Sequence, residues 1–225
     1  MSAKRPTLAE QAYEELQDQI VSGRLPAGRR LLADQLADSL AISQTPVKEA
    51  LARLEQVGLV EGTSRRASVV RRFTFQDIEE IYEARLLLEV QAIGKGLAAG
   101  RATPEFLDRL QAVFDEQMRE LSLQTEQGLA DAIRLDRQFH ELLVGLGSNH
   151  LIADWHRIAL RQTQAIRNYS LASYSIDRVR REHGAIVEAI RAGDADRAVD
   201  AIRFHLKASR EEFLSRPPEE FPTGP

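Results

Sequence analysis

The sequence predicts a mainly α-helical protein, in which an N-terminal winged helix-turn-helix of three helices and a β-hairpin precedes an all-helical antiparallel bundle. Two observations indicate this fold class. Apolar residues recur with a helical period over most of the 225 residues. A strand-like pattern occurs only near residues 59–70, around a basic turn, before a long helical pattern begins near residue 75.

The N-terminal helices are marked by capping residues. Thr7 and Glu10 have the spacing of a capping box at the start of the first helix. A short helix follows, with leucines four residues apart between positions 32 and 40. Thr45 is expected to cap the third helix, with Pro46 at its first position, where the missing N–H is not needed.

The rest of the chain reads as helical, which places a domain boundary after residue 73. The expected domains are 1–73 and 74–214, with a proline-rich tail at 215–225 that is expected to be disordered. The helices of the second domain are predicted at about 75–100, from 104 onward, and near 129–146, 149–170, 175–192 and 195–214.

Composition excludes several classes of protein. There is no cysteine, so a disulfide framework, a thiolate metal site and a cysteine nucleophile are excluded. The net charge is −4, although residues 1–72 carry 11 Lys+Arg against 9 Asp+Glu. No signal-peptide core and no apolar run of transmembrane length is found. The protein is therefore expected to be cytoplasmic, with no membrane partner.

The order of helix, helix, tight turn, helix and hairpin is typical of a winged helix-turn-helix, whose third helix enters the major groove of DNA. Glutamine and lysine read base edges, and small hydroxyls and arginines contact phosphates. The alternative is a three-helix protein–protein module with a solvated basic hairpin. The candidate DNA-contacting residues are Ser43, Gln44, Thr45, Lys48, Arg53, Arg65 and Arg66.

Three histidines and an aspartate have the spacing of a metal site. Asp136 and His140 are four residues apart and project from one face of a helix. His183 and His205 are equidistant from the turn at 192–196, so in an antiparallel helix pair they lie at about the same height. Three helices would then bring four ligands to one point.

These four residues lie on apolar stripes, where ionisable groups are costly unless they are paired or bound to metal. The alternative is a buried Asp–His hydrogen bond with two unrelated core histidines. For a metal, the donor set suits one divalent transition ion, with zinc as first choice and nickel, manganese, cobalt, copper or iron as alternatives. His150 and His156 fall outside this set.

Two groups of motifs resemble a known family. The residues at 26–28, 43–54 and 58–60 are similar to the DNA-binding domain of GntR-type bacterial transcription regulators. The second half is similar to the FCD effector domain of the FadR subfamily, and the resemblance covers about residues 7–210. The motifs that carry this second similarity are 83–89, 136–140, Asn149, 182–183, 193–194 and 205–206.

The resemblance implies a homodimer that binds a pseudo-palindromic double-stranded DNA operator and responds to a small organic acid. It also implies a metal held by Asp136, His140, His183 and His205. The acid would fill open coordination positions of the metal. Candidate effector-binding residues are Arg85, Arg161 and Asn168, although Arg85 also fits a structural ion pair with Glu89. A repressor is the expected form of regulation.

The chain departs from the family pattern at the DNA-reading helix. Arginine is usual in the family where Gln44 and Lys48 stand, and glycine is common at the positions of Ala41 and Arg66. Because glutamine favours adenine and arginine favours guanine, the sequence predicts a shifted operator preference.

Two other functions fit the same residues. One is a pure metal sensor, in which the ion itself is the regulatory signal. The other is a helical-bundle metalloenzyme, whose open coordination position would activate water. Against catalysis, no further carboxylate near the ligand motif is placed to act as a general base, and the N-terminal module would be unexplained. The protein is therefore expected not to be an enzyme.

Overall fold

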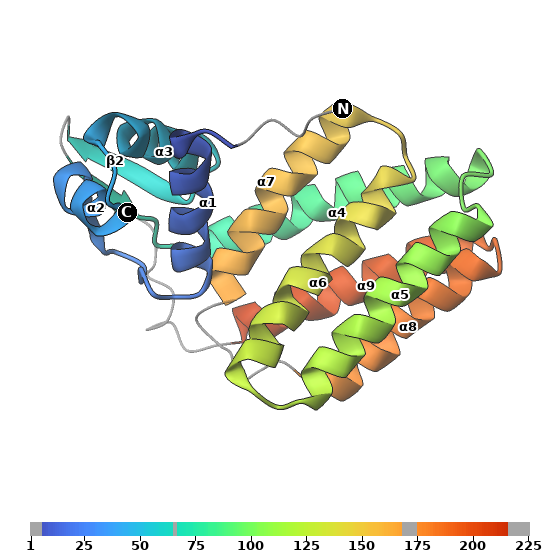
Figure 1. Cartoon of the computed structure of the whole chain (residues 1–225). Helices are drawn as coiled ribbons and strands as arrows, with labels where there is room; N and C mark the ends of the chain where they lie inside the picture. The colour runs from blue at the N-terminus through green and yellow to red at the C-terminus, as the bar shows by residue number, and fades with distance from the viewer. Residues whose placement is uncertain (1–5, 65–66, 168–174, 216–225) are drawn as a thin grey trace. The chain divides into compact units, whose positions relative to one another are not determined.

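The computed structural model describes residues 6–64, 67–167 and 175–215 (Figure 1). The described chain divides into two compact units, one containing the residues up to Phe73 together with 161–167, and the other containing Thr74–Leu160 and the residues from 175. Of the predicted tail at 215–225, residues 216–225 lie outside the described residues. No described helix is long and apolar enough to cross a membrane.

The N-terminal unit is a winged helix-turn-helix, as predicted. Its three strands form one antiparallel sheet in the order β1-β3-β2. The first strand was not predicted, because three residues are too few to show the alternating pattern of a strand. The elements are α1 (Leu8–Val21), β1 (Arg30–Leu32), α2 (Ala33–Leu40), α3 (Gln44–Gln56), β2 (Val60–Ser64) and β3 (Ala67–Val70).

The turn between α2 and α3 is tight because Ala41 adopts a left-handed backbone conformation, with φ of 54°. A non-glycine residue in this conformation costs about 1–2 kcal/mol. Helix α3 then begins at Gln44 with Ser43 as its N-cap, so the predicted start at Pro46 was wrong by two residues. The first four N–H groups of a helix have no partner within it, so proline is also tolerated at the third position.

The C-terminal unit is an all-helical bundle, as predicted. Helix α4 packs on α6 and α9, α5 packs on α6 and α8, and α8 packs on α9 (Figure 1). The turn between α8 and α9 contains Gly193, whose φ is 68°. The helices are α4 (Phe75–Ala98), α5 (Pro104–Ser122), α6 (Glu126–Gly145), α7 (His150–Arg167), α8 (Ile176–Arg191) and α9 (Ala195–Leu214), with residues 161–167 of α7 belonging to the N-terminal unit.

Glycines allow a close approach at one end of α4. A Cβ atom on Gly96 would lie 2.5 Å from Leu146 Cβ and 2.7 Å from its backbone. A Cβ atom on Gly147 would lie 2.9 Å from Ala92. Gly96 therefore allows α4 to pack closely against the end of α6.

Candidate functional site

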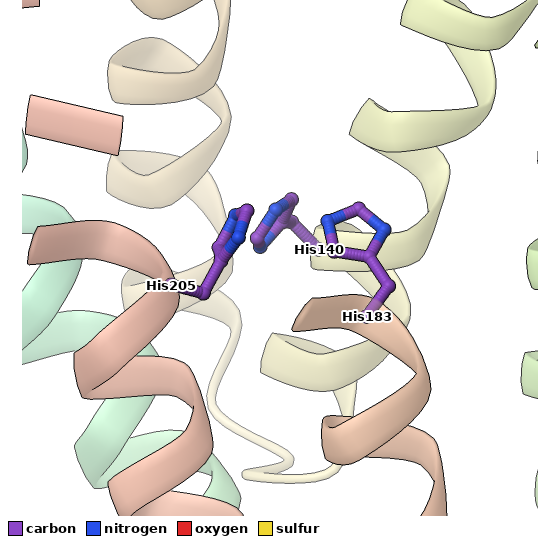
Figure 2. Close-up of side chains that lie close together, drawn as sticks. All are labelled: His140, His183 and His205. Carbon is purple, nitrogen blue, oxygen red and sulfur yellow. The ribbon is translucent and has the colours of Figure 1, made fainter. Parts of the chain in front are cut away.

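Three histidines from three helices meet inside the C-terminal unit. His140 lies on α6, His183 on α8 and His205 on α9, and each residue is buried. One ring nitrogen from each lies within 4.8 Å of the others. Figure 2 shows the three imidazoles gathered between their helices. The turn between α8 and α9 thus brings two histidines 22 positions apart in the sequence to one place, and α6 supplies the third.

Each of these histidines donates a hydrogen bond from Nδ1 to a buried side-chain oxygen. The pairs are His140 with Glu89 Oε2 at 2.7 Å, His183 with Gln117 Oε1 at 2.9 Å, and His205 with Glu182 Oε2 at 2.9 Å. Because a neutral imidazole carries one proton, a proton on Nδ1 leaves the lone pair on Nε2. Metal-binding histidines are commonly oriented by this kind of outer partner.

Asp136 places a carboxylate beside the three rings. It is buried one turn before His140, and its Oδ1 lies 3.7 Å from His183 Nε2. This distance is within the range of an ion pair and longer than a normal hydrogen bond. The aspartate lies where it can join the histidines around a shared ion.

The donor atoms fit a divalent transition metal. Among the residues that the structure describes, Nε2 of His140 and Nε2 of His205 are buried without a hydrogen-bond partner. Buried polar atoms in native proteins are normally satisfied. Three imidazole nitrogens and one carboxylate are ligands that zinc and its neighbours accept, and such an ion would satisfy these atoms.

Burial keeps His140 and His205 neutral near pH 7. Burial alone would raise the pKa of Glu89, but its interactions with His140, Arg85 and His156 hold it well below its usual value. Burial lowers the pKa of His140, although Glu89 opposes this effect. Burial also lowers the pKa of His205, to about 4. Near pH 7 these imidazoles are in the neutral form that binds metal.

The metal-free protein is expected to lose stability as the pH falls from about 6.5 toward 4. His205 titrates near 6.5 when unfolded and near 4 when folded, so protons bind the unfolded chain first. The unfolding free energy should fall by about 3 kcal/mol at most from this group, at about 1.4 kcal/mol per pKa unit. Glu182, whose pKa is lowered on folding despite its burial, adds a loss in the same direction at lower pH.

Denaturant unfolding of the chelator-treated protein, followed by circular dichroism between pH 7 and pH 4.5, measures this dependence. The variant His205→Gln should show a flatter pH profile, because it has no imidazole to protonate on unfolding. A profile as steep as that of the wild type would show that His205 does not cause the loss.

Glu89 connects the histidine cluster to a second set of donors. Its Oε1 accepts hydrogen bonds from Arg85 Nε at 2.9 Å and from His156 Nε2 at 3.0 Å, and all these groups are buried. Within the described part of the chain, the two Nη atoms of Arg85 and the hydroxyl of Tyr82 have no hydrogen-bond partner. The Arg85–Glu89 ion pair therefore forms while two guanidinium nitrogens stay available.

The sequence did not identify the residues that orient the three histidines. Glu89 was interpreted only as an ion-pair partner, and His156 was placed outside the site, whereas the structure joins both to the histidine network. Glu182 directly precedes His183, which is a signal that was available in the sequence. Gln117 lies on a different helix from its partner and has no distinguishing pattern around it.

The DNA-contacting candidates on α3 lie on its exposed side. Gln44, Thr45 and Lys48 are exposed at the start of the helix, and its buried face packs into the unit's core. Ser43 is also exposed, and its side chain makes no capping hydrogen bond. Four polar side chains at one end of α3 are thus available to meet a nucleic acid.

Other candidates are placed differently. The Arg53 guanidinium lies over the Tyr13 ring, 4.2 Å from its centroid, and Arg161 lies 5.6 Å from the same centroid. Arg161 thus stacks within the N-terminal unit, a placement that gives no support to an effector-binding role. Residues 65–66 and Asn168 lie outside the described residues.

The comparisons with known proteins agree with this architecture. Residues 8–70 match the bacterial regulatory proteins of the gntR family, and residues 80–208 match the FCD domain. The chain belongs to the GntR family. Within this GntR-family protein, the N-terminal match covers the winged helix-turn-helix, and the FCD match contains all four candidate metal ligands.

Relatives cover nearly the whole GntR-family chain. The HTH-type transcriptional regulator YdhC of Bacillus subtilis is 30% identical over 205 residues, which is 90% of this chain and 89% of YdhC. A probable D-xylose utilization operon transcriptional repressor of Paenarthrobacter nicotinovorans is 28% identical, with 91% of this chain and 88% of that protein covered. The protein is thus a DNA-binding transcriptional regulator, and its homologues are regulators, not enzymes.

Solved structures show the same fold. The E. coli McbR/YncC structure superposes with a TM-score of 0.79 at 20% identity, covering 93% of this chain and 98% of that one. A GntR regulator from Rhodococcus sp. RHA1 has the same TM-score at 21% identity, with the same coverage.

Proposed function

We propose that this protein is a metal-containing repressor that binds a pseudo-palindromic operator as a homodimer and responds to a small carboxylic acid. The observation that carries the proposal is the orientation of the three histidines. Each Nδ1 is held by a side-chain oxygen, which leaves the lone pair of each imidazole on Nε2, the atom that would bind one ion together with Asp136. Zinc is the first choice for this donor set.

The available nitrogens of Arg85 support a carboxylic acid as the effector. Four protein ligands leave open positions on a five- or six-coordinate ion, and a carboxylate would fill them. Arg85 is fully buried, and its two Nη atoms form the fork that binds a carboxylate. Glu89 links Arg85 to the histidine cluster, since its Oε1 accepts a hydrogen bond from Arg85 and its Oε2 accepts one from His140.

The N-terminal unit supports a double-stranded DNA operator as the partner. An exposed start of α3 suits the major groove, and a dimer would present one α3 to each half of a pseudo-palindrome. The relative from Paenarthrobacter nicotinovorans is named a repressor, which favours repression here. The acid changes operator affinity only if it binds two states of the dimer unequally, typically with about 1–3 kcal/mol of coupling.

Fluorescence anisotropy on DNA that flanks the protein's own gene tests this function. The expected result is tight, sequence-selective binding that weakens with salt and is reversed by an organic acid while metal stays bound. Release by a chelator alone, with no effect of any acid, would instead identify a pure metal sensor. Equal binding to scrambled DNA would contradict recognition of this operator.

Replacement of Arg85 by lysine is expected to weaken the response to the acid without loss of metal. Lysine keeps the positive charge beside Glu89 but lacks the planar fork, so the acid concentration for half-release should rise by about tenfold or more. Arg109→Lys, at an exposed position on α5, is the matched control. An unchanged acid response in Arg85→Lys would remove Arg85 from the effector site.

A further inference from the structure

The three ligand histidines have unequal outer partners. His140 and His205 each donate Nδ1–H to a carboxylate, whereas His183 donates to the neutral amide of Gln117. Gln117 is fully buried on α5. A carboxylate raises the basicity of the imidazole that it holds, and an amide does so much less. His183 is therefore the weakest of the three imidazole donors.

The amide of Gln117 has only one favourable orientation. Its Nε2 donates to the backbone oxygen of Ala132 at 3.3 Å, and its Oε1 accepts from His183 Nδ1 at 2.9 Å. A flipped amide would place its oxygen against the Ala132 oxygen, so two acceptors would face each other. Because Oε1 must accept, the proton of His183 stays on Nδ1, and the lone pair of Nε2 faces the cluster.

The neutral amide also limits the negative charge around the site. Glu89 is paired with Arg85. Glu182 is paired with Arg178 at 3.1 Å and with Arg181 at 3.6 Å, and Arg178 also pairs with Glu212. With these pairs neutral overall, Asp136 adds one further carboxylate beside the histidines in the described part of the chain. A divalent ion at the site would keep one positive charge, and a fourth carboxylate would cancel it.

We propose that Gln117 is the positioning residue for His183, and that its neutral amide preserves the positive charge that an anionic ligand of the metal needs. The inference rests on the proposed metal function and deepens it. Compared with a carboxylate at position 117, the amide lowers the metal affinity of His183 and raises the affinity of the bound metal for anions.

Two variants of the full-length protein separate these roles. Gln117→Leu removes the hydrogen bonds to His183 and to the Ala132 backbone, and Gln117→Glu restores an acceptor for His183 while adding a charge. Gln111→Leu, on the same helix but away from the histidines, is the control. Zn²⁺ affinity is measured by competition with a chromophoric chelator. Anion affinity is measured by titrating azide into the Co²⁺-loaded protein and following its visible absorption.

The expected result is a loss of about 10–100-fold in Zn²⁺ affinity for Gln117→Leu, as outer-partner changes typically cause. Gln117→Glu should bind Zn²⁺ at least as tightly as the wild type, yet bind azide more weakly. Circular dichroism of the metal-free variants checks that they fold. If Gln117→Leu does not fold, the comparison of Gln117→Glu with the wild type still decides the charge effect.

Wild-type Zn²⁺ affinity in a folded Gln117→Leu variant would overturn the positioning role. Equal azide affinity in Gln117→Glu and wild type would overturn the charge role. In both cases the metal function itself would stand, because the wild type would still bind Zn²⁺. Failure of the wild type to bind Zn²⁺ or Co²⁺ would overturn the proposed metal function together with this inference.

Discussion

Replacing His183 with alanine is expected to reduce the metal retained by the purified protein from about one ion per chain to background. The change removes one of three imidazoles and leaves Asp136 and Gln117 without the ring between them. Loss of a direct ligand should lower affinity by more than the roughly 10–100-fold that loss of an outer partner costs. Metal analysis after gel filtration measures this directly.

The control must separate metal loss from unfolding. The His183 ring is fully buried and stacks on Phe139, with centroids 4.4 Å apart, so alanine also leaves a cavity. His183→Gln fills most of that volume without an imidazole and should lose metal equally. His150→Ala, at an exposed position on α7, should retain the ion. Full metal retention by folded His183→Ala would refute the assignment of the site.

The helices and the meeting of the three histidines could be predicted because both depend on local spacing. A helical period and capping residues define α1, where the Thr7–Glu10 capping box forms as expected. The symmetry of His183 and His205 about the Gly193 turn requires only that two neighbouring helices be antiparallel. No further knowledge of the tertiary structure is needed for these steps.

The outer partners could not be predicted in this way, because they depend on which helices become neighbours. Glu89 is 51 positions from His140, and Gln117 is 66 positions from His183. Neither spacing has a period that a single sequence reveals. The strand β1 was missed for a different reason, since its pairing with Ala67–Val69 fixes three residues that have no strand pattern of their own.

Replacing Gln44 with arginine is expected to change the operator that the protein prefers. Gln44 is exposed at the first position of α3, where it can meet a base edge. Glutamine forms two hydrogen bonds with adenine and arginine forms two with guanine, and each pair discriminates by about 1–3 kcal/mol. Site selection should return adenine for the wild type and guanine for the variant at one position in each half-site.

Affinity of the variant for the wild-type operator should fall by about 5–150-fold, which corresponds to the same 1–3 kcal/mol. Gln56→Arg adds the same charge at the other, exposed end of α3 and is the control. Added charge alone should tighten binding to all DNA and steepen its salt dependence, whereas a changed base contact alters the response to one base pair. If Gln44→Arg selected the wild-type operator and bound every sequence more tightly, Gln44 would lie against the phosphate backbone. Base recognition would then fall to Lys48, which is exposed on the next turn of the same helix.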